Sequence, residues 1–191
     1  MIINYIGADN KVGTTMIAAS VASMLGEGTA LVCKGSAAGS QYEAKAVLWP
    51  EEDLHPKEVS NILEGLKNSY ENIVIDSGSD IYSGLVVGAI ENADINVVVT
   101  TQQKSSLDRL KVCVSDLIKP MKVKCDLVIN KYIEGAFASI KDITALGEFG
   151  DVNVVRYSQY GWEAEQQMSS LMKYPGFYRD LKKYEKTIRF I

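Results

Sequence analysis

Residues 7–22 read GADNKVGTTMIAASVA and decide the fold. They follow the apolar run Ile2–Ile6, which predicts a buried strand, and they lead into Thr14–Leu25, which predicts a helix. A loop between a strand and a helix directs backbone N–H groups and the positive end of the helix dipole at one point. The segment therefore predicts a loop shaped to hold a phosphate group.

Short apolar runs alternate with helical stretches along the rest of the chain. The further predicted strands are Thr29–Val32, Asn72–Ile75, Asn96–Thr100, Lys122–Ile129 and Val152–Val155. The further predicted helices are Pro56–Tyr70, Tyr82–Glu91, Ser105–Ile118 (ended by Pro120), Ala136–Phe149, Glu163–Met172 and a last helix from Phe177. Runs such as Val97–Val99 are apolar at every position, as in strands covered on both faces. The alternation predicts a single-domain α/β fold, a mostly parallel sheet with helices on both faces.

Composition sets the broad class of the protein. The chain has 191 residues, 47% of them hydrophobic and 23% charged, and its net charge is -4. These values fit one globular domain without a global attraction to nucleic acid or anionic lipid, so any such binding would need a local patch. No secretion signal and no apolar stretch near the ~20 residues of a spanning helix are found, which predicts a cytoplasmic protein.

The cysteines do not form a metal-binding pattern. Cys33, Cys113 and Cys125 are widely spaced, and His55 is the single histidine of the sequence. No CxxC pair or cluster of cysteine and histidine occurs. The spacing predicts buried free thiols in a reducing compartment and argues against zinc.

The loop resembles the deviant Walker A motif of the ParA/MinD-type P-loop ATPases, written GKGGVGKTT. Aligned on the shared Val12-Gly13, Thr15 stands at the threonine that binds Mg²⁺, and Asn10 and Lys11 fall on the paired glycines. The resemblance implies a nucleotide site. Its implied residues are Asp9, Asn10, Lys11, Val12, Gly13, Thr14, Thr15 and Met16.

Later segments continue the resemblance in the same order, over most of residues 1–170. The segment Asn72–Gly78 is similar to the Walker B strand and its switch, with Asp76 at the carboxylate beside Mg²⁺. Residues 93–101 resemble the next strand, and Leu127–Lys131 resembles the strand whose terminal asparagine, here Asn130, contacts adenine. The resemblance implies ATP or ADP with Mg²⁺ held by Thr15 and Asp76, and a homodimer or a protein partner.

The chain departs from the family where catalysis needs charge. Thr14 replaces the Walker lysine, and Asp9 replaces the signature lysine that reaches across a dimer. After the second strand the family shows Asp-x-Asp-Pro, whereas this chain has Cys33-Lys34-Gly35-Ser36. Phosphoryl transfer depends mainly on positioning and on stabilisation of charge, so these losses predict weak or absent hydrolysis.

Each implied site residue also has an ordinary structural alternative. Thr14 and Thr15 are suitable N-cap residues, Asp76 lies in good turn chemistry, and Asn130 could cap the end of a strand. Lys11 is either a phosphate contact or a solvated loop lysine. Their coincidence at family positions favours the nucleotide-site interpretation.

The last segment, residues 175–191, follows a domain predicted to span residues 1–174. The positions on one helical face are Phe177, Leu181, Tyr184, Ile188 and Ile191. The basic positions are Arg179, Lys182, Lys183, Lys186 and Arg189. Two interpretations stay open: a helix packed on the sheet, and a surface-targeting tail that makes the protein peripheral to a membrane, as in MinD-like relatives.

A retained fold with lost lysines predicts a ParA/MinD-like protein of lost or very weak ATPase activity that acts as a scaffold or positioning factor. Atypical family members that localise pilus or secretion machinery, such as TadZ and CpaE, relax the phosphate loop in a similar way. One alternative is an active ATPase that uses Lys11 or Lys34 in place of the Walker lysine. The other is a DNA-associated partition or regulatory protein, for which the basic tail gives weaker support.

Overall fold

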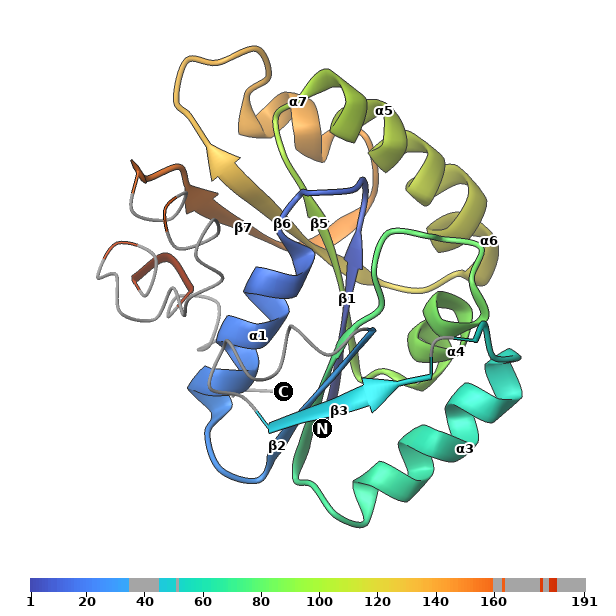
Figure 1. The fold of residues 1–191 in the computed structure, drawn as a ribbon. Coiled ribbons are helices and arrows are strands. Elements are labelled where there is room, and N and C mark those ends of the chain that lie inside the picture. Colours follow the sequence, from blue (N-terminus) through green and yellow to red (C-terminus); the bar gives the residue numbers. More distant parts are fainter. Residues whose placement is uncertain (35–44, 51, 160–162, 164–175, 177–178, 182–191) are drawn as a thin grey trace.

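The computed structural model describes residues 1–34, 45–50, 52–159, 163, 176 and 179–181 (Figure 1). These residues form a seven-stranded sheet in the order β3-β2-β4-β1-β5-β6-β7, and all of its neighbouring strands are parallel. The strands are β1 Ile2–Gly7, β2 Thr29–Lys34, β3 Lys45–Trp49, β4 Asn72–Asp76, β5 Ile95–Thr100, β6 Cys125–Tyr132 and β7 Phe149–Arg156. The predicted α/β class and parallel sheet are confirmed.

Helices alternate with the strands along the chain. They are α1 Thr14–Leu25, α3 Pro56–Lys67, α4 Gly84–Asn92, α5 Lys104–Cys113, α6 Lys119–Met121 and α7 Ile140–Thr144, with a π-helical turn at Val114–Ile118. α1 packs on one face of the sheet, where its Ile17 and Val21 meet inward side chains such as Leu31 and Val97. The helices α3, α4, α5 and α7 cover the opposite face (Figure 1). Each large side chain buried in this way contributes about 1.5–3 kcal/mol.

The central strand places the loop of residues 8–13. All six residues of β1 are buried, between β4 on one side and β5 on the other. Because every strand is parallel, the loop that leaves β1 lies at the middle of the carboxyl edge. Open α/β sheets bind ligands at this edge, where the order of the strands reverses.

Two helices differ from their predicted bounds for identifiable reasons. The prediction that Pro120 ends the helix begun near Ser105 is wrong, because α6 includes Pro120. In a regular helix the ring of Pro120 would clash with the carbonyl of Asp116, and here Asp116 lies in the π-helical turn. The helix predicted for Ala136–Phe149 is shorter, because Ser139 and Asp142 form a capping box that starts α7 at Ile140.

Other bounds shift by a few residues, and one strand was not predicted. β3 is an edge strand with exposed or half-buried residues at its first four positions, so it lacks the apolar run of a buried strand. α4 begins two residues later than predicted because Ser83 is its N-cap. The predicted helices at Glu163–Met172 and from Phe177 lie largely outside the described residues. In that region Leu181 is buried against the α1 face, and Asp180 pairs with Arg156 at 3.0 Å.

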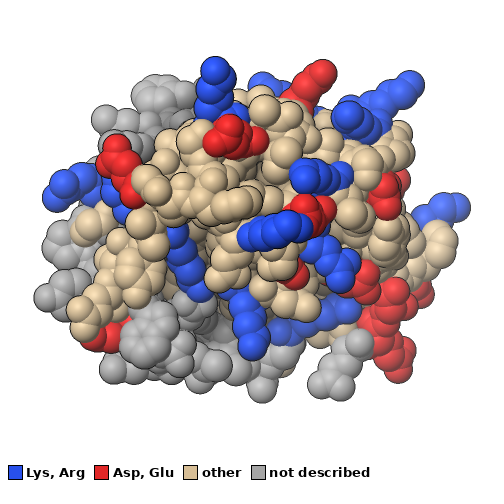
Figure 2. All heavy atoms as spheres, turned by 90° about the horizontal axis from the view of Figure 1, so that it is seen from above, with Lys and Arg blue, Asp and Glu red and all other residues tan. Residues whose placement is uncertain are grey.

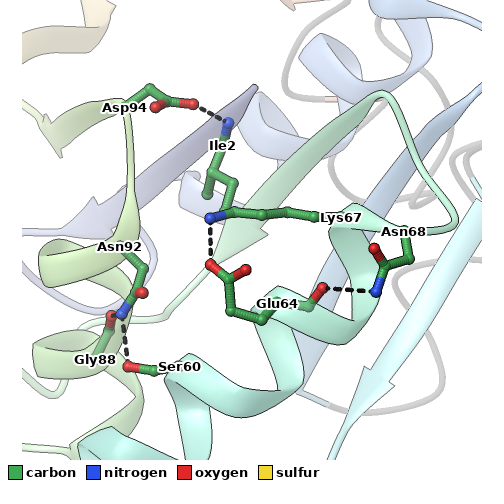
Figure 3. Close-up of polar contacts among 8 residues, drawn as sticks. All are labelled: Ile2, Ser60, Glu64, Lys67, Asn68, Gly88, Asn92 and Asp94. Carbon is green, nitrogen blue, oxygen red and sulfur yellow. Dashed lines mark hydrogen bonds and ion pairs between the residues drawn. The ribbon is translucent and has the colours of Figure 1, made fainter.

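The amino edge of the sheet is closed by polar contacts (Figure 3). Asp94 accepts a hydrogen bond from Ile2 N at 2.6 Å, next to the start of β1. Asn92 joins α4 to α3, since its amide donates to Ser60 Oγ and to Gly88 O, each at 2.8 Å. No helix among the described residues has the length and apolar character that a membrane span requires.

Buried polar side chains connect β1 and β5 to each other, to the segment after β4 and to α4. Asn4 in β1 is fully buried and donates to Asn96 Oδ1 in β5 at 3.0 Å. Asn4 Oδ1 accepts from Ser77 Oγ at 2.9 Å, and Asn96 donates to Ile90 O at 3.2 Å. A buried polar group costs free energy when its partner is removed, so these contacts depend on one another.

Asn4→Leu is expected to lower the free energy of unfolding by about 1–3 kcal/mol, because Asn96 Oδ1 loses its buried donor. The matched control is Asn68→Leu at the exposed end of α3, where the amide donates to Glu64 O at 3.4 Å (Figure 3). Urea unfolding of both variants measures the difference. Equal losses in the two variants would contradict a special role for the buried asparagine.

Candidate functional site

The loop of residues 8–13 is anchored on both strands that flank β1. Gly7 N donates to Gly78 O, just after β4, and Ala8 N donates to Val99 O in β5, both at 2.8 Å. On the outer side, Asn10 Oδ1 accepts from Ser79 Oγ at 2.6 Å. The loop and the segment after β4 are therefore held together.

The start of α1 presents backbone donors. Its N-cap is Gly13, which has a φ of 91° and offers no side-chain capping bond. The alternative that Thr14 or Thr15 caps this helix is therefore wrong. Within the described part of the chain, the N–H groups of Val12, Gly13, Thr14 and Thr15 form no hydrogen bond. Orphan donors at a helix start, together with the helix dipole, favour an anion.

The end of β6 holds the loop from the other side. Asn130 is 1% exposed, and its Nδ2 donates to Val12 O at 2.8 Å. Its Oδ1 accepts from Lys131 N at 2.9 Å. Asn130 thus contacts the loop of residues 8–13, and its contact with adenine stays a prediction. A Cβ on Gly13 would lie 2.4 Å from Asn130 Nδ2, so this position requires glycine.

Thr15 and Asp76 meet at the carboxyl edge. Thr15 Oγ1 donates to Asp76 Oδ2 at 2.5 Å, and Gly78 N donates to Asp76 Oδ1 at 3.3 Å. Asp76 is 7% exposed, and this burial raises the pKa of its carboxyl above the ordinary value, while the bonds from Thr15 and Gly78 act in the opposite direction. A hydroxyl and a carboxylate at one point are ligands that Mg²⁺ accepts.

The structure places the remaining candidate residues in different surroundings, some buried and some exposed. Thr14 and Met16 are buried, and a Cβ on Gly7 would lie 2.6 Å from Thr14 Oγ1, so Thr14 packs against the end of β1. Lys11 is exposed, with a left-handed φ of 62°. Lys34 is exposed at the end of β2, whose Cys33 pairs in register with Asp76.

A polar cavity of about 250 Å³ lies beside the loop. Its lining residues are Ala8, Asp9, Asn10, Ser79, Asp80, Ile81, Arg109 and Val112. Ser79 and Arg109 line this cavity and Lys131 contacts the loop, although sequence reasoning assigned these residues no role there. The alternation of strands and helices could have placed them at the carboxyl edge, but not beside this loop.

Figure 2 shows this face of the molecule from above. Lys and Arg side chains are spread over its middle, and Asp and Glu side chains gather mainly toward one side. Lys11 and Arg109 are exposed and Lys131 is half-buried, all at or beside the loop. Positive charge therefore reaches this edge although the loop lacks the Walker lysine.

The cysteines behave as predicted. Cys33, Cys113 and Cys125 are buried free thiols, and burial raises the pKa of Cys113 and of Cys125 to about 12. Among the described residues no group of three or more His, Cys, Asp or Glu could hold a metal ion.

Comparison with known proteins decides the fold. No family model and no curated protein matches the sequence. Among solved structures, the MinD cell division protein of Aquifex aeolicus matches with a TM-score of 0.76 and 16% identity, over 98% of this chain and 96% of that one. The chain has the ParA/MinD fold. A ParA family ATPase from Chlorobium tepidum TLS gives a TM-score of 0.73 at 16% identity, with 96% of each chain covered.

A third match with the ParA/MinD fold contains a nucleotide. The septum site-determining protein MinD from Pyrococcus horikoshii OT3, complexed with Mg-ADP, gives a TM-score of 0.67 at 14% identity, covering 91% of this chain and 88% of that chain. At these identities the likeness establishes the fold, and it confirms the architecture that the sequence resemblance implied.

Proposed function

We propose that this protein binds ATP or ADP with Mg²⁺ at the loop of residues 8–15, hydrolyses it very slowly or not at all, and acts as a scaffold or positioning factor. The observation that carries the proposal is the pairing of orphan N–H groups at the start of α1 with the Thr15–Asp76 contact. Both features would be needed to hold a nucleotide with its metal.

The residues present fit a bound nucleotide. The N–H groups of Val12 to Thr15 would receive phosphate oxygens, and Thr15 and Asp76 would hold Mg²⁺. When bound, Mg²⁺ neutralises charge on the phosphates. Asp9 opposes a triphosphate by charge, and its carboxylate accepts a bond from Asn10 N at 2.8 Å. This repulsion favours modest affinity.

Slow turnover follows from the missing cation. Thr14 occupies the position of the Walker lysine, and it is buried against Gly7 rather than directed at the phosphates. Removing one preorganised donor to a developing charge costs roughly 10²–10³ in rate in other enzymes. A chain that retains donors for binding and lacks this group is suited to respond to nucleotide rather than to consume it.

Partners and location belong to the proposal. A homodimer or a protein partner would reach the loop face, where the 250 Å³ cavity opens beside Asp9 and Asn10. A cytoplasmic location is expected, with membrane contact through residues 175–191 as the alternative. The buried Leu181 and the Asp180–Arg156 pair support packing of that part on the domain.

Calorimetric titration with ATP and ADP, with and without Mg²⁺, is expected to show binding that Mg²⁺ strengthens. A turnover assay on the same protein is expected to stay near the no-enzyme background. Absence of binding at millimolar nucleotide would contradict the proposal. Turnover well above background that falls in Lys11→Ala or Lys34→Ala would instead establish the alternative of an active ATPase.

A further inference from the structure

We propose that a groove at the amino edge of the sheet binds a small anionic amphiphile, a molecule with one carboxylate or phosphate and an apolar body. The groove lies between the π-helical turn of Val114–Ile118, α6 and the residues that lead into β6 and β7, and its volume is about 630 Å³. The loop of residues 8–13 lies at the opposite, carboxyl edge. The proposal therefore concerns a second site and goes beyond the nucleotide binding proposed above.

The floor of the groove is apolar. Val114 and Ile118 are buried beneath it, and Val123 and Phe149 are half-buried beside them. A Cβ on Gly147 would lie 2.9 Å from both Phe149 Cζ and Val114 Cγ2, so glycine lets the ring of Phe149 lie close to the backbone there. Ligand pockets typically measure about 300–1,000 Å³ and combine an apolar lining with a few polar groups. This groove has that size and that kind of lining.

Three lysines line the rim of the groove. Lys119 lies in α6, and Lys122 and Lys124 lie in the segment that leads into β6. All three are exposed, and among the described residues none of them forms an ion pair. Of the described residues that line the groove, Glu148 is the only acidic one. The chain as a whole has a net charge of -4, so this local excess of positive charge would attract an anion.

Lys124 differs from the other two lysines because its stem crosses Gly150. A Cβ on Gly150 would lie 2.7 Å from Lys124 Cε and 2.5 Å from Asp126 Oδ1. Burial raises the pKa of Asp126, and the charge of Lys124 acts on that pKa in the opposite direction. Lys124 therefore has an acidic neighbour already, and the anionic head of a ligand falls to Lys119 and Lys122.

The backbone at Lys122 has an uncommon conformation. Lys122 is the C-cap of α6 and has a left-handed φ of 55°. Its N–H donates to Lys119 O at 3.2 Å, and Val123 N donates to Ile118 O at 3.4 Å. Left-handed residues other than glycine and π-helical turns both concentrate at functional sites. These bonds connect the two rim lysines and the apolar floor within one short segment.

The arrangement selects a ligand by its two ends. Lys119 and Lys122 would receive the anionic head, and the apolar body would cover Val123 and Phe149. Because Val123 and Phe149 are half-buried within the groove, one small molecule can enter and cover them, whereas a flat membrane surface would touch only the exposed lysines. The ligand is therefore a monomeric amphiphile.

The test is calorimetric titration of the full chain with dodecanoate, with dodecyl maltoside and dodecyltrimethylammonium as neutral and cationic probes of the same chain length. Dodecanoate is expected to bind in preference to both. Octanoate is expected to bind about 10-fold more weakly than dodecanoate or less, because it buries fewer CH₂ groups. Millimolar Mg²⁺-ADP is expected to leave dodecanoate binding unchanged, because the two sites lie at opposite edges of the sheet.

Two double variants test the rim lysines. Lys119→Gln with Lys122→Asn removes both charges, and asparagine suits the left-handed backbone at the second position. This variant is expected to bind dodecanoate about 10-fold more weakly, the order expected for two exposed charge contacts, while Lys119→Arg with Lys122→Arg keeps the affinity. The matched control is Lys57→Gln, which removes an exposed lysine of α3 away from the groove.

Each contrary result overturns the inference. Equal binding of the three dodecyl probes would show an unselective apolar surface, and unchanged dodecanoate affinity in the Gln/Asn variant would show that the rim lysines do not bind the head. Sedimentation with phosphatidylglycerol vesicles that depends on the same lysines, without dodecanoate binding, would show a membrane surface instead. Nucleotide binding at the loop of residues 8–13 is measured separately, so the proposed function stands or fails independently of these results.

Discussion

Alanine in place of Gly13 is expected to weaken nucleotide binding about 100-fold. Gly13 has a φ of 91°, and a Cβ at this position would lie 2.4 Å from Asn130 Nδ2. Left-handed backbone costs an alanine roughly 1–2 kcal/mol, and displacing Asn130 from Val12 O costs about 1 kcal/mol more. The unliganded variant is expected to relieve these costs by relaxing its loop, so nucleotide binding must restore them at about 2–3 kcal/mol, which is on the order of a 100-fold change in affinity.

The control for this prediction is Gly26→Ala at the end of α1. Gly26 has a φ of 78°, and a Cβ there would meet no atom within 4 Å. This variant shares the backbone cost but lies at the opposite end of the helix from the loop. Calorimetric titration with Mg²⁺-ADP and a thermal melt of each variant make the comparison. Unchanged ADP affinity in a folded Gly13→Ala protein would contradict nucleotide binding at this loop.

The local sequence pattern was sufficient to predict the elements that form the core of the site. The run Ile2–Ile6 and the following helical stretch predicted β1 and α1, because each element depends mainly on its own residues. The meeting of Thr15 with Asp76 was also predictable. Carboxyl ends of parallel strands meet at one edge, and a residue at the end of β4 therefore lies beside the loop after β1.

What the sequence did not predict depends on neighbours that lie far away in the chain. The contact of Lys131 with the loop depends on how the end of β6 meets it, and nothing near Lys131 in the sequence signals that contact. Ser79 bonds Asn10 for the same reason. The helix continues past Pro120 because a π-helical turn precedes it, and periodicity does not reveal this local irregularity.

Asp76→Asn is expected to stabilise the fold while removing the effect of Mg²⁺ on nucleotide binding. Burial raises the pKa of Asp76, so the folded state holds its proton more tightly than the unfolded state does. The contribution of Asp76 to stability is therefore full at low pH and is lost as pH rises through the folded pKa. At neutral pH the buried charge opposes folding, and a neutral amide removes that cost.

The expected stability gain appears as a rise in melting temperature of about 2–4 °C for each kcal/mol, measured at neutral pH without nucleotide. In the same variant the strengthening of ADP or ATP binding by Mg²⁺ is expected to be lost, because the amide lacks the negative charge of a carboxylate ligand. Calorimetry with and without Mg²⁺ measures this second effect.

Asp142→Asn serves as the control, because it is expected to lower the stability of the protein where Asp76→Asn raises it. Asp142 is exposed, and the bonds from Ser139 hold the pKa of its carboxyl below the ordinary value. Its contribution to stability is present above the unfolded pKa and is lost as pH falls, so the amide should weaken α7 slightly and leave binding unchanged. If Asp76 only closed a turn, its replacement by asparagine would likewise lower the stability of the protein. If Asp76→Asn lowers the melting temperature and retains the Mg²⁺ effect, Asp76 is such a turn residue and the metal site is not there.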